Sequence, residues 1–178
     1  MDKLIIKGGS KISGSVNVHG SKNSALPIIV SSLLSKKTLK LSNVPNVVDV
    51  LNLIKLLKNY GVKIEHKKNK LKINPSKIKN LSADYDVVRK MRASILILGP
   101  LLSRFGEARI SLPGGCAIGT RPIDIHLAGL SKLGANFEIQ NGFVVGSVKS
   151  QLIGNKIKLP FPSVGATENI LMASVLAK

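Results

Sequence analysis

The sequence repeats itself, and this repeat limits the folds that a chain of 178 residues can adopt. The segment KNYGVKIE at 58–65 resembles SKLGANFE at 131–138, and ALPIIVSSLL at 25–34 resembles SILILGPLL at 94–102. The period of about 70 residues is longer than the periods of solenoid repeats. We therefore expect a duplicated α/β unit, with copies over about 22–75 and 90–147 and a third copy that begins at residue 163.

Each copy has the same expected order of elements, which is helix, strand, helix, strand, strand. In the first copy, apolar periodicity predicts a helix that Ser21 caps and that reaches Leu34, a second helix over 47–57, and strands over 38–41, 62–65 and 71–73. In the second copy, it predicts helices over 91–102 and 123–133, and strands over 108–112, 135–139 and 143–145. Gly61 and Gly134 both follow a second helix, at the position where a left-handed residue ends helices.

The two copies differ most between the strand and the second helix. Three residues separate Pro45 from Asp49 in the first copy, whereas ten separate Pro113 from Asp124 in the second. The longer segment contains the only cysteine, Cys116, among glycines and near an arginine. Extra loop length costs little entropy, and such loops often carry binding and catalytic groups. We therefore predict that Cys116 is an accessible thiol in a positive field, where it is a reactive acid or nucleophile, and not a buried small hydrophobe.

Basic residues open the first helix of both copies, namely Lys22 within GSKNSA and Arg92 within KMRAS. A helix N-terminus attracts anions through its free N–H groups and its dipole, so these cations predict a phosphate or carboxylate site. The third copy opens with FPSVGATEN, whose Ser163, Gly165 and Thr167 also suit a phosphate. A simple helix N-cap explains Ser163 almost as well.

The cysteine and histidine content limits the cellular compartment and the kinds of catalytic site that can be expected. A single cysteine cannot form an internal disulfide, and the first residues lack the apolar run of a signal peptide or membrane span, so we expect a soluble cytoplasmic protein with no membrane partner. With one cysteine and three histidines, neither a metal site nor a cysteine-protease dyad is predicted, and we expect no cofactor. We expect His126 to face either solvent or a neighbouring helix.

The chain is strongly basic, with 27 Lys and Arg against 9 Asp and Glu and a net charge of +18. Such a charge attracts nucleotides, phosphates, nucleic acid or acidic lipid. The lysines are scattered, which is typical of a solvated surface, and 4 Phe and 2 Tyr are few for base stacking. A basic nucleic-acid-binding module is nevertheless an alternative function, and tight binding of a random oligonucleotide that weakens steeply with salt would distinguish it.

Five motifs resemble the UDP-N-acetylglucosamine enolpyruvyl transferases, also called 1-carboxyvinyltransferases; in chain order they are GSKNSALP, MRAS, LPGGCAIGTRPID, LGA and PSVGATEN. The cysteine loop separates this family from the enolpyruvyl-shikimate-phosphate synthases, which share its fold. The resemblance implies an inside-out α/β barrel domain of repeated helix-strand-helix-strand-strand units, with the active site between two such domains. It also implies that residues 1–21 are a strand segment belonging with an absent second domain, and that residues 22–178 are an incomplete, truncated first domain.

The resemblance further implies a reaction and a set of site residues. The family transfers the enolpyruvyl group of phosphoenolpyruvate to UDP-N-acetylglucosamine and releases phosphate, which is the first committed step of peptidoglycan synthesis. Cys116 would be the catalytic acid and the atom that fosfomycin alkylates. Phosphoenolpyruvate would be bound by Lys22, Asn23 and Arg121. Contacts to UDP-N-acetylglucosamine would come from Asn23, Arg92, Arg121, Pro122, Ile123, Asp124, Ile125, Ser163, Val164 and Gly165.

Two features depart from the family pattern. Some members carry a lysine two residues before Ser163, where this chain has Phe161, so only the backbone can contact a phosphate at that position. The family's aspartate base and several further arginines come from the second domain, so we expect the chain by itself to be inactive. A non-functional remnant of a split gene is a further alternative.

Overall fold

The helices and strands follow the predicted order in both copies of the repeat. The computed structural model describes residues 3–79, 81, 92–112 and 123–178. The first copy consists of α1 (Lys22–Ser31), the 3-10 helix η1 (Ser32–Leu34), β1 (Leu39–Leu41), α2 (Val48–Asn59), β2 (Lys63–Lys67) and β3 (Lys70–Asn74). The second copy consists of the 3-10 helix η2 (Arg92–Ile97), α4 (Leu98–Phe105), β4 (Glu107–Ser111), α5 (Asp124–Lys132), β5 (Ala135–Gln140) and β6 (Phe143–Val148), and α6 (Val164–Ser174) opens the third.

The strand order of two small sheets confirms the duplication. One sheet has the order β1-β3-β2 and the other has the order β4-β6-β5. Every neighbouring pair in these sheets is antiparallel. The last strand of each copy therefore lies in the centre of its sheet, with the first and second strands on either side.

Gly61 and Gly134 make the same chain reversal after α2 and after α5. Their φ angles are 91° and 97°, in the left-handed region that glycine adopts without the steric penalty of a Cβ atom. The N–H groups of both glycines donate to a carbonyl in the last turn of the preceding helix, at 2.9 Å in each case. The prediction that these glycines end matched helices is confirmed.

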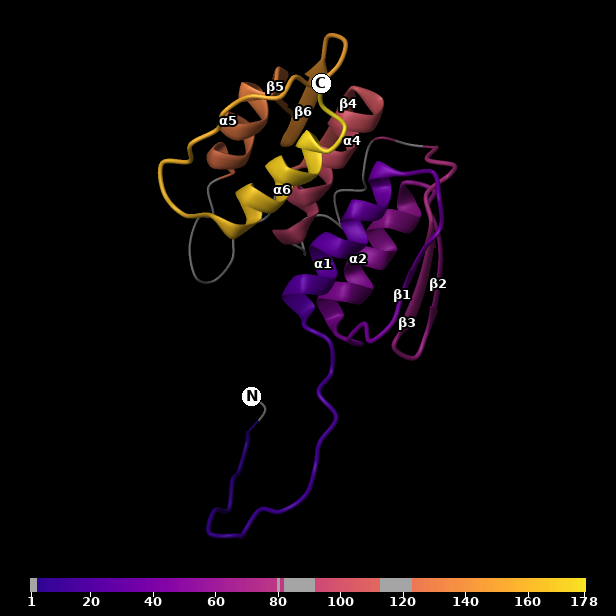
Figure 1. The fold of residues 1–178 in the computed structure, drawn as a ribbon, viewed down its shortest axis with the longest axis vertical. Coiled ribbons are helices and arrows are strands. Elements are labelled where there is room, and N and C mark those ends of the chain that lie inside the picture. Colours follow the sequence, from indigo (N-terminus) through magenta and orange to yellow (C-terminus); the bar gives the residue numbers. More distant parts are fainter. Residues whose placement is uncertain (1–2, 80, 82–91, 113–122) are drawn as a thin grey trace.

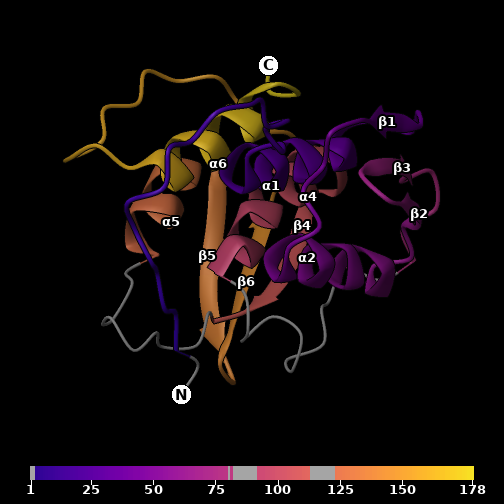
Figure 2. The same ribbon diagram turned by 90° about the horizontal axis from the view of Figure 1, so that it is seen from below.

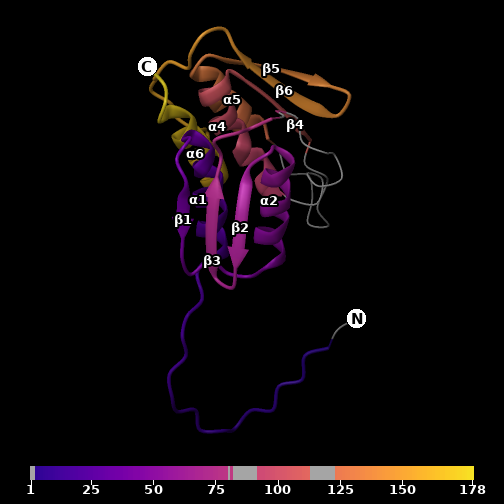
Figure 3. The same cartoon turned by 90° about the vertical axis from the view of Figure 1, so that its right-hand side faces the viewer.

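Each sheet lies on the outside of the molecule and packs against one side of the helices of its copy. Figure 3 shows the sheet β1-β3-β2 covering α1 and α2, and the sheet β4-β6-β5 lies over the second group of helices. Seen from below in Figure 2, α6 lies beside α5 and α4 of the second copy. Fully buried side chains from helices and sheets form one continuous core, including Ile29, Leu57, Ile73, Leu101 and Val144. This arrangement confirms the predicted α/β architecture, with sheets packed on the outer side of the helices.

The helices also run in the same general direction. In Figure 1, the axes of α1, α2, α4, α5 and α6 all run from lower left toward upper right. Each helix N-terminus carries unpaired N–H groups and the positive end of the helix dipole. The fold therefore gathers several partial positive charges at one end of the molecule, which favours anions there.

The predicted helix over 91–102 is divided into η2 and α4. A continuous α-helix would join the N–H of Gly99 to the carbonyl of Ile95, four residues earlier. Both groups instead bond the side chain of Asn169, whose Oδ1 accepts from Gly99 at 2.8 Å and whose Nδ2 donates to Ile95 at 2.9 Å. An inserted side chain interrupts a helix, and Pro100 has no N–H to make the next bond. The cause lies 70 residues beyond Gly99, so the local pattern could not reveal it.

Arg104 of α4 joins the two copies. Its Nη1 donates to the carbonyls of Leu33 and Ser35, at 2.7 and 3.0 Å, where the first helix of the first copy ends. Its Nη2 donates to the carbonyl of Pro75 at 3.2 Å, directly after β3. Burial lowers the pKa of Arg104, but an arginine stays protonated in proteins, so the bonds remain charge-assisted.

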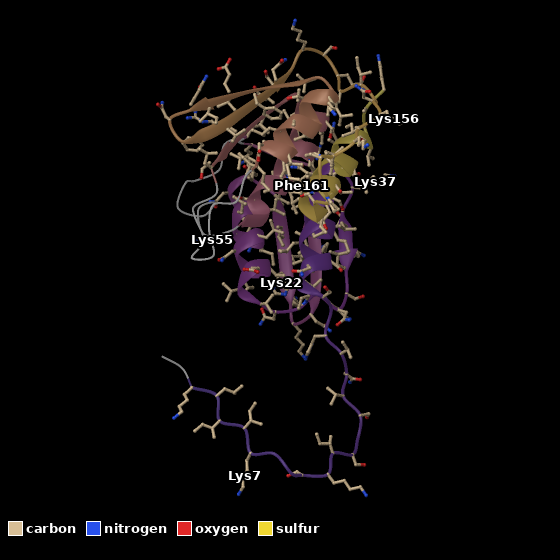
Figure 4. All side chains as sticks on the ribbon, turned by 90° about the vertical axis from the view of Figure 1, so that its left-hand side faces the viewer. Lys7, Lys22, Lys37, Lys55, Lys156 and Phe161 are labelled. Atoms are coloured by element: carbon tan, nitrogen blue, oxygen red, sulfur yellow. The ribbon has the colours of Figure 1, made fainter. Side chains whose placement is uncertain are left out.

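Residues 3–20 extend away from the body of the molecule (Figures 1 and 4). They contain no helix or strand, and their large apolar side chains are 80–96% exposed; these are Leu4, Ile5, Ile6, Ile12, Val16 and Val18. The segment is joined to the body where the N–H of Gly20 donates to Oδ1 of Asn43 at 3.1 Å. Within the described part of the chain, these apolar side chains pack against nothing.

Candidate functional site

Lys22 begins α1, as predicted, and its ammonium pairs with a carboxylate on the next helix. Ser21 caps α1, with its Oγ accepting from the N–H of Ser24 at 3.4 Å. The Nζ of Lys22 lies 2.6 Å from Oδ2 of Asp49, which stands in the first turn of α2. Figure 4 shows Lys22 toward the lower end of the body, and the exposed Asn23 follows it in the chain. Two helix N-termini therefore meet at this ion pair.

Asp49 is a site residue that the sequence analysis did not identify. The two side chains are 47% and 41% exposed, so their pairing contributes only ~0–1 kcal/mol to stability. An ammonium has three N–H donors, and one bond to Asp49 leaves the others able to reach an anion. The available signal was the aspartate that opens the second helix of both copies, Asp49 in α2 and Asp124 in α5.

Ser163 caps α6, which supports the simpler of its two interpretations. Its Oγ accepts from the N–H of Ala166 at 3.3 Å, and its carbonyl accepts from Oγ1 of Thr167 at 2.8 Å. The Val164 side chain is 76% exposed at the start of the helix, and Phe161 is 55% exposed. The Thr167 hydroxyl proton is therefore used within the helix, whereas the Ser163 oxygen serves as the N-cap acceptor.

A cavity of about 170 Å³ lies between α5 and the segment 157–160. Its lining residues come from both, namely Asp124, Ile125, Ala128, Gly129, Lys132, Ile157, Lys158, Leu159 and Pro160. Asp124 and Ile125 are also residues predicted to bind the nucleotide sugar, and Ile123 is half-buried just before them. Pockets for whole ligands are typically about 300–1,000 Å³, so this cavity has the size for one ring of a larger ligand.

His126 faces a neighbouring helix and not solvent, which decides between the two predicted alternatives. The residue is 8% exposed, and its Nδ1 lies 3.2 Å from Nδ2 of Asn169 on α6. Its ring also lies beside Gly165, where an added Cβ atom would be 3.3 Å from Cε1 of the ring. The start of α5 and the start of α6 are therefore in contact through this histidine.

The predicted site residues that the structure describes lie at helix starts on the same end of the body (Figure 1). They are Lys22 and Asn23 at α1, Arg92 at η2, Ile123, Asp124 and Ile125 at α5, and Ser163, Val164 and Gly165 at α6. Cys116, Arg121 and Pro122 lie outside the described residues, so their roles stay predictions. Residues from three repeats are therefore brought to one end by the parallel helices.

The positive charge is spread over the surface. All lysines within the described ranges are exposed, and Figure 4 shows Lys7, Lys22, Lys37, Lys55 and Lys156 on different parts of the molecule. This spread is typical of a solvated surface and not of one nucleic-acid stripe. In the same ranges, no group of three or more His, Cys, Asp or Glu residues is placed to hold a metal ion, and no helix is long and apolar enough to cross a bilayer.

Burial raises the pKa of Glu168 on α6, which predicts a pH-dependent effect of its replacement. Because the folded pKa lies above the unfolded value, the folded state loses stability as pH rises through this interval. We expect Glu168→Gln to raise Tm at pH about 7 and to leave it unchanged at pH about 3, where folded and unfolded chains both carry the proton. Thermal unfolding at both pH values measures this, with Glu107→Gln on β4 as an exposed control. An equal gain in the two variants would contradict the prediction.

The parallel interior helices, the external antiparallel sheets and the anion-attracting end together define an enolpyruvyl transferase domain. The sequence profile described as EPSP synthase (3-phosphoshikimate 1-carboxyvinyltransferase) matches residues 6–178, and the chain belongs to this family. The structure resembles the enolpyruvyl transferase NikO from Streptomyces tendae, with a TM-score of 0.78 and 20% identity over 96% of this chain and 40% of that one. It also resembles EPSP synthase from Acinetobacter baumannii, with a TM-score of 0.73 and 20% identity over 93% and 38% of the two chains. At these identities the likeness shows the fold.

Sequence relatives give a more specific comparison. The chain is 52% identical over 178 residues to UDP-N-acetylglucosamine 1-carboxyvinyltransferase of Campylobacter fetus, covering 100% of this chain and 42% of the relative. It is 49% identical over 179 residues to UDP-N-acetylglucosamine 1-carboxyvinyltransferase 1 of Halalkalibacterium halodurans, covering 100% and 41%. The predicted resemblance to this group of transferases is confirmed. The chain spans less than half the length of these relatives.

Proposed function

We propose that this chain supplies one domain of a cytoplasmic enzyme that transfers the enolpyruvyl group of phosphoenolpyruvate to UDP-N-acetylglucosamine, releases phosphate, and so begins peptidoglycan synthesis. The observation that carries the proposal is the 52% identity, over the whole chain, to transferases of that name. The matched region spans all 178 residues, so it includes every helix start at which the predicted site residues lie. The proposal therefore rests on a match that covers the candidate site and not only the core.

The charge of the candidate site suits both substrates. Phosphoenolpyruvate carries a phosphate and a carboxylate, and the nucleotide sugar carries a diphosphate. The N-termini of α1, α5 and α6 lie at one end of the body, and Lys22 adds a half-exposed ammonium there. Helix N-termini and cations at one end of a basic protein stabilise bound anions. We place phosphoenolpyruvate near Lys22 and Asn23, and the nucleotide sugar near α5 and α6.

The proposed chemistry is an addition followed by an elimination. The sugar 3-hydroxyl gives its proton to a base as its oxygen forms a bond to C2 of phosphoenolpyruvate. At the same time the thiol of Cys116 gives its proton to the methylene carbon, so the C2–C3 double bond becomes single and the methylene becomes a methyl group. A base then removes a proton from that methyl group, the C2–C3 double bond forms again, and the C2–O bond to phosphate breaks and releases phosphate. A thiol is a suitable general acid near neutral pH. The base is an aspartate of the second domain, by resemblance to the family.

Exposed apolar surface supports two proposed contacts of this chain. One is with a second domain, and the other is with the remainder of its own domain. The apolar side chains of residues 3–20 are 80–96% exposed, and on α6 the side chains of Leu171 and Val175 are 65% and 62% exposed. Apolar surface of this extent usually marks an interface. We propose that residues 3–20 form a strand in a second domain, and that the exposed face of α6 packs on the remainder of the third repeat.

A chimera tests the proposed reaction directly. Residues 1–178 are joined to the part of the Campylobacter fetus relative that follows the matched region. We expect the chimera to release phosphate only when both substrates are present, and we expect no release from the 178-residue chain or from the added part alone. Cys116→Ala in the chimera should abolish release, whereas Ser10→Ala, in the exposed N-terminal segment, should not. A folded chimera without activity would contradict the proposal.

Fosfomycin labelling tests the half-site in the 178-residue chain. We expect mass spectrometry to find one adduct on Cys116, and we expect the nucleotide sugar to accelerate its formation. Cys116→Ala should show no adduct. An adduct whose rate the nucleotide sugar does not change would count against a formed site. Oligonucleotide binding that is tight and falls steeply with salt would favour the nucleic-acid alternative instead.

A further inference from the structure

The side chain of Asn169 has only one orientation that satisfies its neighbours. The N–H of Gly99 can only donate, so the atom 2.8 Å from it is the amide oxygen. The carbonyl of Ile95 can only accept, so the atom 2.9 Å from it is the amide nitrogen. Both contacts give the same assignment independently, and Asn169 is 0% exposed. The amide thus takes the place of the hydrogen bond that a continuous helix would make between residues 95 and 99.

The second N–H of this amide points to His126. Nδ2 of Asn169 lies 3.2 Å from Nδ1 of the histidine ring, and an amide nitrogen can donate but not accept. Nδ1 must therefore be the acceptor in this bond and carry no proton. In a neutral imidazole only one nitrogen is protonated, so the proton is on Nε2.

We infer that Asn169 is a positioning residue, which fixes His126 in the Nε2–H tautomer and so places a proton donor beside the first turn of α6. A Cβ atom added to Gly165, in that turn, would lie 3.6 Å from Nε2. The consequence rests on the proposed function, because the nucleotide-sugar diphosphate is placed at this helix start. The ring nitrogen nearer this turn is Nε2, which is a donor in this tautomer and would carry a lone pair in the other.

Three separate segments are needed to build this arrangement. Gly99 on α4 leaves room for the amide, since a Cβ atom there would lie 2.5 Å from Oδ1 of Asn169. Aspartate at position 169 could accept from Gly99 but could not donate to Ile95 or His126. Leucine could do neither and would leave buried groups unpaired. Asparagine is therefore suited to both tasks, which are to pair the two backbone groups that its insertion separates and to determine the histidine tautomer.

Long-range proton–nitrogen NMR of the nitrogen-15-labelled 178-residue chain tests the inference, because the two ring nitrogens have different shifts when protonated and unprotonated. The chain has three histidines, and the His126→Gln spectrum identifies the signals of His126. At pH about 8.5, where histidine is neutral, we expect the proton on Nε2. Asn169→Ala should reduce the ratio of Nε2–H to Nδ1–H by about fivefold, the ratio that a typical buried hydrogen bond produces.

Asn155→Ala is the matched control. The amide of Asn155 also donates to a backbone carbonyl, that of Lys132 at the end of α5, but it is exposed and does not contact His126. This variant should keep the wild-type ratio. A proton on Nδ1 of His126 in the wild-type chain would overturn the inference, and so would a ratio unchanged by Asn169→Ala. If Asn169→Ala does not fold, the wild-type spectrum still tests the inference, because it shows which ring nitrogen of His126 carries the proton.

Titration with UDP-N-acetylglucosamine separates the inference from the proposed function. We expect the nucleotide sugar to shift the amide signals at the start of α6 and the Nε2 signal of His126, with the tautomer unchanged. Shifted amides with a change to the Nδ1–H tautomer would overturn the inference while the proposed binding stands. No binding would contradict the proposed function, and the ligand-free spectrum would still support or overturn the tautomer assignment.

Discussion

Gly99→Ala is expected to lower the free energy of unfolding by ~2–3 kcal/mol, as overpacking in a close-packed interior does. A Cβ atom at this position would lie 2.5 Å from Oδ1 of Asn169 and would also collide with its backbone oxygen. A backbone atom cannot rotate away, so α4 and α6 would have to separate. Alanine gains ~1 kcal/mol over glycine from helix propensity, which is too little to offset this loss. Urea unfolding followed by circular dichroism measures the difference.

Gly129→Ala is the matched control for this prediction. Gly129 is a buried glycine of α5, and an added Cβ atom would meet the side chain of Ile170 on α6. The end of an isoleucine side chain can change its rotamer, so the collision is relieved without moving a helix. We expect a change within about 1 kcal/mol, because helix propensity and repacking act in opposite directions. Equal losses in the two variants would show that backbone approach at Gly99 is not the cause.

Arg104→Ala is expected to lower the free energy of unfolding by ~2–3 kcal/mol, because three charge-assisted hydrogen bonds are lost and two partly buried carbonyls are left without this donor. The guanidinium bonds the carbonyls of Leu33, Ser35 and Pro75, so it connects the second copy to the end of the first helix and to the residue after β3 of the first copy. Its partial exposure keeps the expected loss below the sum of three such bonds. Arg104→Lys should recover less than half, since one ammonium cannot reproduce the planar fork.

Arg109→Ala distinguishes this connection from a general effect of losing an arginine. Arg109 lies exposed on β4 with its guanidinium 4.5 Å from the ring centre of Phe143 on β6, within the same copy. An exposed cation–π contact contributes ~0.5–1 kcal/mol, so a smaller loss is expected. Unfolding in urea compares all three variants. Full stability of Arg104→Lys, or equal losses in Arg104→Ala and Arg109→Ala, would contradict the role assigned to Arg104.

Features that depend on neighbouring residues could be predicted from the sequence. Ser21 and Ser163 cap their helices through N–H groups three residues ahead, and the glycines after α2 and α5 adopt the expected left-handed conformation. Each of these features is decided by steric and hydrogen-bonding rules within one helical turn. The internal repeat extended these local predictions to the whole architecture, because the order of helices and strands in one copy predicts the same order in the other.

Features that depend on distant residues could not be predicted in the same way. The pairing of Lys22 with Asp49 joins two helices, and the division of the helix over 91–102 depends on Asn169, which is 74 residues from Ile95. The sequence did not distinguish whether His126 faces solvent or a neighbouring helix, because apolar periodicity does not predict which helices pack against each other. The predicted roles of Cys116, Arg121 and Pro122 concern residues outside the described ranges, so they depend on the family resemblance and on the experiments above.

The sequence by itself determined the duplicated α/β unit, its helix ends and the family to which the chain belongs. Helix and strand propensity, helix capping and the internal repeat can all be recognised from residues that are close together in the chain. Only the tertiary structure decided which groups meet: Asp49 with Lys22, Arg104 with the carbonyls of the other copy, and Asn169 with His126. The physical reason is that a buried donor needs an acceptor within about 3 Å, and the packing of helices distant in the chain determines which acceptor that is.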